Sequence, residues 1–251
     1  MEITVVTVSL LLGTGLIAGI INTLAGGGSN LTLPALMIMG LPADMANATN
    51  RVGVIMHTMV TLRSFSRHGK LPMQGAKGLF LPVLVGGVIG SVLASYLPAT
   101  LLKPILLTTM ISMSLVMLFR PGMVFPSAHE QPQALVRWSK SWWLLLLSGV
   151  YGGFVQAGVG FVLIAVIAGG LRYDLVRTNA LKILCTGTFT SVALALFIWR
   201  GQVVWVPGLI LASATMAGGL IGVRLALNIS PLVMKWVLFV MTVVVSVAAL
   251  L

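Results

Sequence analysis

The sequence predicts an all-α polytopic membrane protein made of two inverted-topology repeats. Three observations carry this prediction: the composition, a series of apolar runs of helical length, and motifs that recur in the same order in both halves. Of the 251 residues, 58% are hydrophobic and only 8% are charged, which excludes a soluble globule. At about 20 residues per helical crossing, the length allows roughly eight spans and no soluble domain. The lipid bilayer is therefore the first partner that we expect.

Apolar runs place the elements in order along the chain. Two of them, 31–41 and 161–170, are too short to cross a bilayer alone. The first 25 residues resemble a secretory signal but have no basic region ahead of the apolar run, so we interpret them as a retained first span. The eight runs of spanning length cover residues 3–24, 46–62, 78–97, 101–119, 141–157, 176–199, 203–223 and 232–251.

The least hydrophobic stretch of the chain lies at its middle. Residues 120–140 contain Pro121, Pro126, Glu130 and Pro132, a composition typical of an exposed linker. We therefore divide the chain into a first membrane repeat, 1–119, a cytoplasmic linker, 120–140, and a second membrane repeat, 141–251.

Motifs recur in the two halves in the same order. Paired glycines, an amide side chain and a glycine-rich turn follow one another near the start of each half. Such repetition is typical of membrane proteins built from structural repeats. Each repeat is expected to hold four long spanning helices and one short helix after a glycine-rich hairpin turn. The matching positions are Gly15, Gly19, Asn22 and 25–28 with Gly149, Gly153, Gln156 and 157–160, then Asp44, Asn50, 86–90 and Lys103 with Asp174, Asn179, 218–222 and Lys235.

The loop charges decide between two topologies. If each short run extends the preceding span, the loop cations divide eight to five between the two sides. If each short run doubles back after its glycine turn, they divide eleven to two, which is the asymmetry that orients membrane proteins. The second topology inverts the second half relative to the first and puts both chain ends outside. Its cationic side holds Arg63, Arg67, Lys70, Lys77, Arg120, Arg137, Lys140, Arg172, Arg177, Arg224 and Lys235, and its other side holds Lys103 and Arg200.

The glycine-rich turns are the first candidate site. Gly26, Gly27 and Gly28 precede Ser29 and Asn30 and then an apolar run with Pro34 in its first turn, which predicts a chain break and a helix start capped by Ser29 or Asn30. A helix N-terminus at membrane depth attracts anions. The turn with Gly158 and Gly160 predicts a second such end. The alternative is a glycine kink satisfied by neighbouring helices.

Polar side chains on the long helix after each short run form the second candidate site. With Asp44 and Asp174 as N-caps, Arg51 and Lys182 lie about 10 and 12 Å into their helices. Charged groups at that depth indicate a functional site; the alternative is interhelical hydrogen bonding, with both cations snorkelling to the surface. The stripes contain Asn47, Asn50, Arg51, Val54, His57, Thr58 and Thr61 in the first half and Asn179, Lys182, Thr186 and Thr190 in the second.

Three further side chains have two interpretations each. Asn22 and Gln156 precede the two glycine turns, so they either donate hydrogen bonds to a ligand or hold the hairpins together. His57 is a packing residue or a proton carrier, because histidine titrates near neutrality.

The paired glycines at 15 and 19, 86 and 90, 149 and 153, and 218 and 222 have the spacing of close helix packing.

The sequence offers little for an enzyme. It contains no Ser-His pair in a nucleophile motif, no paired buried carboxylates and no metal-ligand spacing. We therefore expect no catalysis, no cofactor and no metal. The net charge of +11 is explained by loop cations that orient the chain, and no nucleic-acid partner is expected.

The second half resembles the TauE/SafE sulfite exporter family. The resemblance is carried by the segments 149–154, 158–161 and 177–182, with support from the first glycine turn and from 218–222. It implies a multi-pass permease of the bacterial inner membrane for a small sulfur-containing anion, sulfite or an organosulfonate. Members of this family usually have a more apolar segment where this chain has Asn47, Asn50 and Arg51, so the pocket here is expected to be more polar and cationic.

The leading hypothesis is thus a secondary transporter that moves a small anion by alternating access. The alternative is an anion channel, because the same basic stripe would serve a pore. A homodimer is compatible with a compact permease, although the sequence indicates no interface. Substrate contacts are expected from Asn22, Gly27, Gly28, Ser29, Asn30, Asn50, Arg51, His57, Gln156, Gly158, Gly160, Asn179, Lys182 and Thr186.

Overall fold

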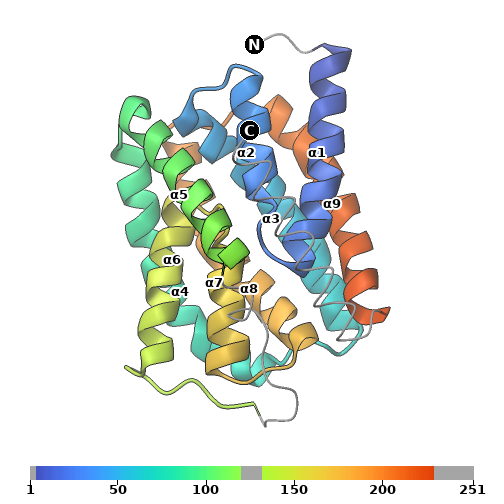
Figure 1. Ribbon diagram of the computed structural model, residues 1–251, viewed down its shortest axis with the longest axis vertical. Coiled ribbons are helices and arrows are strands. Elements are labelled where there is room, and N and C mark those ends of the chain that lie inside the picture. The colour runs from blue at the N-terminus through green and yellow to red at the C-terminus, as the bar shows by residue number, and fades with distance from the viewer. Residues whose placement is uncertain (1–3, 120–131, 229–251) are drawn as a thin grey trace.

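The computed structural model describes residues 4–119 and 132–228, and every regular element in these ranges is a helix (Figure 1). Four helices are long and apolar enough to cross a bilayer: α1, α4, α8 and α9. The predicted run 232–251 lies outside the described residues. The elements are α1 (Val5–Leu24), α2 (Ser29–Ile38), α3 (Ala43–Arg67), α4 (Met73–Tyr96), α5 (Ala99–Phe119), α6 (Lys140–Phe154), α7 (Val159–Ile164), the π-helix η2 (Ala165–Gly170), α8 (Leu175–Trp199) and α9 (Trp205–Asn228).

The predicted spans agree with the helices in position more than in length. The expected eight spans are shown only in part, because α6 has 15 residues and is too short to cross a bilayer by itself. The helix α3 has 25 residues but carries the polar stripe, so it is not among the four apolar spans. Both helices therefore depend on protein neighbours rather than lipid for much of their surroundings.

The chain doubles back after α1 and again after α6. Leu36, near the end of α2, belongs to the same apolar cluster as Leu11 of α1, so α2 returns along the helix that precedes it. A Cβ on Gly170, at the end of η2, would lie 2.9 Å from Oγ of Ser141 at the start of α6. We call α1, residues 25–28 and α2 the first hairpin, and α6, residues 155–158, α7 and η2 the second hairpin.

Left-handed residues make both turns. Gly26 has φ +91°, and in the second hairpin Gln156 and Gly158 have φ 68° and 74°, a conformation that ends helices and that glycine adopts without strain. The two turns meet inside the protein, since a Cβ on Gly26 would collide with the Cα of Gly160. The tips of the two hairpins thus form one contact.

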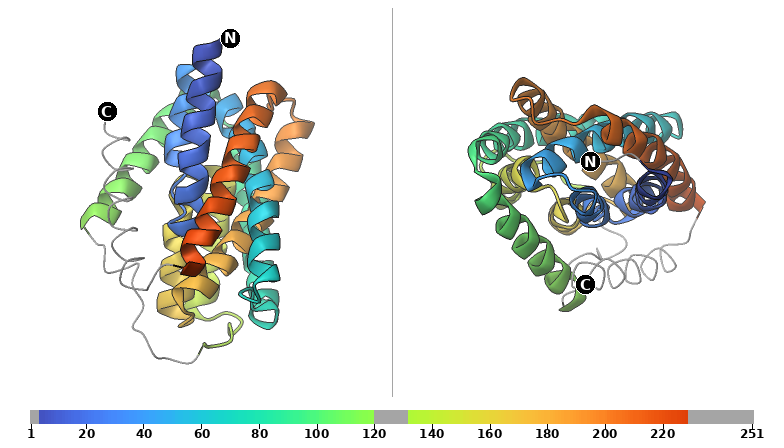
Figure 2. Two further views of the ribbon diagram at one scale, coloured as in Figure 1. Left: turned by 90° about the vertical axis from the view of Figure 1, so that its right-hand side faces the viewer. Right: turned by 90° about the horizontal axis from the view of Figure 1, so that it is seen from above.

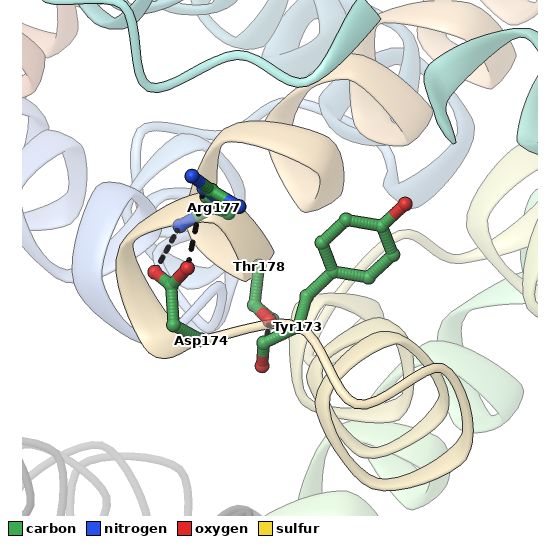
Figure 3. Close-up of polar contacts among 4 residues, drawn as sticks. All are labelled: Tyr173, Asp174, Arg177 and Thr178. Atoms are coloured by element: carbon green, nitrogen blue, oxygen red, sulfur yellow. Dashed lines mark hydrogen bonds and ion pairs between the residues drawn. The ribbon is translucent and has the colours of Figure 1, made fainter. Parts of the chain in front are cut away.

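The start of α8 confirms one predicted cap. The Oδ1 atom of Asp174 accepts a hydrogen bond of 2.9 Å from the backbone N–H of Arg177, and its Oδ2 lies 3.4 Å from Nε of Arg177 (Figure 3). The Oγ1 atom of Thr178 donates to the carbonyl of Tyr173 at 3.1 Å, which closes the same turn.

Two other predicted caps are wrong. Gly28 already has helical angles, φ −58° and ψ −33°, so α2 begins at Ser29 without a side-chain cap from Ser29 or Asn30. Pro34 consequently lies inside α2 rather than in its first turn. Pro42 is the N-cap of α3, because its ring presets the angle that starts a helix, and Asp44 therefore lies within the first turn.

Small residues bring two pairs of helices into close contact, as their spacing predicts. A Cβ on Gly19 of α1 would lie 3.0 Å from the backbone nitrogen of Gly219 on α9, and a Cβ on Gly149 of α6 would lie 3.1 Å from the Cα of Gly86 on α4. Figure 2 shows α1 and α9 running side by side. The first helix of each hairpin thus packs closely against a helix of the other half, α1 against α9 and α6 against α4.

Cationic residues gather at one end of the described structure. Phe65, Leu71, Leu175 and Ala226 share one apolar cluster, so the end of α3, the starts of α4 and α8 and the end of α9 lie together (Figure 1). Arg200 lies at the opposite end, where its guanidinium is 3.5 Å from the carbonyl of Ser95. The cationic end carries Arg63, Arg67, Lys70, Lys77, Arg137, Lys140, Arg172, Arg177 and Arg224.

Candidate functional site

A small cavity opens at the start of α2, where the first hairpin meets α3 and α9. It has room for about one water molecule. Five residues that the sequence nominated line it: Asn22, Gly28, Ser29, Asn50 and His57. The other lining residues are Ala18, Gly19, Thr32, Val54 and Thr215.

The first turn of α2 supplies one wall because its glycine permits a close approach to α1. A Cβ on Gly28 would collide with the carbonyl oxygen of Ala18, so only glycine brings the start of α2 this near. The backbone N–H groups in the first turn of α2 donate to the carbonyls of residues 27 and 28, so what the start of α2 offers the cavity is the partial positive charge of the helix dipole. The cavity therefore lies at an electropositive helix end, enclosed by buried Ser29 and Asn50.

Side chains of α2 and α3 form a directed hydrogen-bond chain at this wall. Thr32 donates its hydroxyl hydrogen to Oδ1 of Asn50 at 2.6 Å, and Nδ2 of Asn50 donates to Oγ of Ser29 at 3.1 Å. Because the oxygen of Ser29 accepts from Asn50, the hydroxyl hydrogen of Ser29 can be donated to a ligand in the cavity. A hydrogen-bond donor that faces the cavity suits an anion better than a cation.

His57 forms the opposite wall. Its Nε2 lies 3.1 Å from the carbonyl oxygen of Gly19 and 2.9 Å from Oγ1 of Thr23, and its Nδ1 lies 3.4 Å from Nδ2 of Asn22. A carbonyl only accepts hydrogen bonds, so Nε2 carries the hydrogen of the neutral ring. The lone pair of Nδ1 then faces the amide of Asn22 at the cavity.

Arg51 lies outside this wall and binds the end of the second hairpin's first helix. Its guanidinium donates to the carbonyl of Gly152 at 2.6 Å and to that of Gly153 at 2.9 Å. These carbonyls belong to the last turn of α6, where helix ends leave unpaired acceptors and partial negative charge. Arg51 is 0% exposed, so the alternative of snorkelling to the surface is wrong. Asn47 supports it by donating to the carbonyl of Phe154 at 2.9 Å.

Lys182 binds the end of α1, the first helix of the first hairpin, in the same way. Its Nζ donates to the carbonyl of Thr23, in the last turn of α1, and to Oδ1 of Asn179, both at 2.9 Å. Lys182 is 1% exposed, so it does not snorkel either. Arg51 of α3 thus binds the end of α6, and Lys182 of α8 binds the end of α1. In both cases the partners are carbonyl or amide oxygens and not carboxylates.

The remaining nominated residues lie at the hairpin tips or on α8 and do not line the cavity. Gly27 faces the ring of Phe161, and a Cβ there would lie 2.7 Å from Cε2. Gly160 contacts Gly26, and Gly158 makes the second turn. Gln156 and Asn179 are buried with one unpartnered amide atom each, Oε1 and Nδ2. Asn30 and Thr186 are also buried.

Sequence reasoning missed three polar residues of the site. Thr32 stands three residues after Ser29, a spacing that puts both on one helix face and could have revealed it. Thr23 contributes a carbonyl and a hydroxyl, and Thr215 reaches the cavity from α9. Neither has a counterpart in the repeated motifs, so no signal in the sequence indicated them.

The chain is similar in sequence to known membrane transporter proteins. The family model described as "Sulfite exporter TauE/SafE" matches residues 11–249. A probable membrane transporter protein from Sinorhizobium sp. is 28% identical over 236 residues, which are 93% of this chain and 88% of that protein. One from Haemophilus influenzae is 24% identical and covers 91% of this chain and 88% of its own. The probable membrane transporter protein YfcA of Escherichia coli is 28% identical and covers 87% and 82%. The chain is a multi-pass membrane transporter that belongs to the sulfite exporter TauE/SafE family.

Proposed function

We propose that this transporter is a secondary permease that moves a small anion, sulfite or an organosulfonate, across the bacterial inner membrane. The observation that carries the proposal is the cavity at the N-terminus of α2. There the partial positive charge of the helix end, the hydroxyl of Ser29 and the amide of Asn50 converge on one buried space. The family match supports a sulfur-containing anion as the substrate.

The charge of the surroundings favours an anion as well. Arg51 and Lys182 are buried cations with carbonyl and amide partners, so their positive charge is not cancelled by a carboxylate. Within the described residues, the carboxylates Asp44 and Asp174 lie at helix starts rather than at the cavity. A small sulfonate or sulfite, for which the water-sized cavity has to widen, would bring the negative charge that this region lacks.

The transport cycle follows from two repeats of opposite orientation, 1–119 and 141–251. Contact between Gly26 and Gly160 at the tips supports a movement in which one half rocks against the other. The cationic end of the described structure is assigned to the cytoplasm by the positive-inside rule. The meeting of the tips and the water-sized cavity favour a carrier that closes around its substrate over an open channel.

The proposal is tested by uptake into proteoliposomes that contain the purified chain. Labelled sulfite and labelled ethanesulfonate are offered, and uptake is compared with vesicles that lack protein. Asn50→Asp keeps the size of the side chain but adds a negative charge beside Ser29, so uptake should fall at least about tenfold if one like-charge contact acts at the anion.

Asn228→Asp is the matched control, because Asn228 is exposed at the end of α9. It should transport as the unaltered chain does. Equal uptake by the Asn50→Asp variant would overturn the site, whereas no uptake of either anion by the unaltered chain would overturn the proposed substrate class.

A further inference from the structure

The cavity contains one feature that anion binding alone leaves unused, the imidazole of His57. Its side chain is 1% exposed and lines the cavity together with Asn22. Nε2 is engaged by Gly19 and Thr23, while Nδ1 faces the side-chain amide of Asn22 at 3.4 Å. A proton arriving from the cavity would therefore be taken up at Nδ1, which holds the lone pair.

Asn22 can accommodate that proton without movement of the backbone. Its side chain is partly buried at the cavity, and rotation of its amide would exchange Nδ2 for Oδ1 as the atom that faces Nδ1. The oxygen would then accept the hydrogen of the imidazolium. The same pair of residues thus fits both protonation states of the ring.

One charged neighbour of His57, Lys182, makes protonation of the ring depend on the anion. From α8, Lys182 binds the carbonyl of Thr23, the residue whose hydroxyl contacts the ring. From α9 the ring is covered by Gly219, and from α1 by Gly19, Asn22 and Thr23, none of which titrates. Lys182 therefore opposes a second positive charge, and an anion in the cavity would offset that opposition.

We infer that His57 carries a proton together with the anion, so that the transporter is an anion–proton symporter. This inference rests on the proposed function. Anion and proton each raise the affinity for the other, as the reciprocity of linked binding requires. The proton comes from water on the open side, is held at Nδ1 during the movement, and is released with the anion on the other side. A monovalent sulfonate and roughly one proton per cycle leave no net charge transferred.

Ethanesulfonate is the probe for this inference, because its sulfonate does not titrate between about pH 5 and 8, where histidine does. Proteoliposomes enclose a pH-sensitive dye, and the membrane potential is clamped. An inward ethanesulfonate gradient without a pH gradient should acidify the interior in the unaltered chain. With His57→Gln, the number of protons that enter per ethanesulfonate taken up should fall at least about tenfold, whatever the rate of ethanesulfonate exchange, because the ring that holds the proton is gone. His68→Gln is the matched control, since His68 is exposed at the end of α3, and it should behave as the unaltered chain.

Asn22→Leu gives a second measurement that does not require the histidine variant to fold. It removes the oxygen that accepts from Nδ1–H, so the ratio of protons to anions should fall at least about twofold even where anion exchange is slower. Exchange by the unaltered chain without acidification, or acidification that persists in His57→Gln, would overturn the inference and leave the anion site standing. No exchange of ethanesulfonate by the unaltered chain would contradict the proposed function itself.

Discussion

The two hairpins share a plan but differ in what they enclose. The first hairpin ends in a ten-residue α-helix whose start lines the cavity. The second continues from a six-residue α-helix into a six-residue π-helix, and its tip residues Gly158 and Gly160 do not line that cavity. The repeat of sequence motifs therefore predicts a repeat of backbone turns more reliably than a repeat of binding sites.

The difference lies in the residues that follow each turn. After the first turn come Ser29 and Thr32, which join Asn50 in a hydrogen-bond chain. After the second turn come Val159, Phe161 and Leu163, which pack into apolar clusters. One tip thus places hydroxyl groups beside the cavity, and the other packs against its neighbours with an apolar surface.

The largest effect is expected where the tips touch. A Cβ on Gly160 would collide with the Cα of Gly26, so Gly160→Ala should lower the free energy of unfolding by about 3 kcal/mol, as overpacking against backbone does. The measurement is unfolding in detergent micelles with increasing denaturing detergent.

Gly169→Ala is the control for that substitution, because nothing lies within 4 Å of a Cβ at Gly169. It should change stability little. If both variants lose the same amount, contact between the tips does not hold the two hairpins together.

The second largest loss of stability is expected at the two buried cations, Arg51 and Lys182, and should differ between them. Arg51 donates to three backbone carbonyls of α6, whereas Lys182 donates to one carbonyl of α1 and to Oδ1 of Asn179. Arg51→Gln is therefore expected to lose at least about 1.5 kcal/mol more stability than Lys182→Gln, since hydrogen bonds to charged groups are worth about 1.5–3 kcal/mol each. The same unfolding measurement checks this difference.

Arg51→Lys refines this prediction. It keeps the charge but cannot span two carbonyls as a guanidinium does, so it should recover only part of the loss. Lys103→Gln, at an exposed position of α5, is the matched control and should leave stability unchanged. A larger loss for Lys182→Gln than for Arg51→Gln would reverse the comparison.

The sequence predicted the helical fold, both turns and the depth of the polar residues, because hydrophobic periodicity and glycine placement are local signals. It listed Asn22, Ser29, Asn50 and His57 among a longer set of candidate substrate contacts, and the structure places these four at one cavity. It could not separate ligand-facing groups from groups that cap another helix. Arg51 reaches Gly152 across 101 positions of the chain, and only the tertiary fold decides that such a cation meets carbonyls.

The smallest effect tests Asn22 and Gln156, which precede equivalent turns. Gln156 has φ 68° and a buried, unpartnered Oε1, so Gln156→Gly should relieve backbone strain and raise the free energy of unfolding by about 0.5–1 kcal/mol. Asn22 lies inside α1, where glycine costs about 0.5–1 kcal/mol, so Asn22→Gly should lower it. Only Asn22→Gly should also slow anion uptake, because Asn22 lines the cavity and Gln156 does not. If Gln156→Gly raises the free energy of unfolding, Asn22→Gly lowers it, and only Asn22→Gly slows anion uptake, the first hairpin holds the ligand. Slower uptake in Gln156→Gly would show instead that both hairpins contact it.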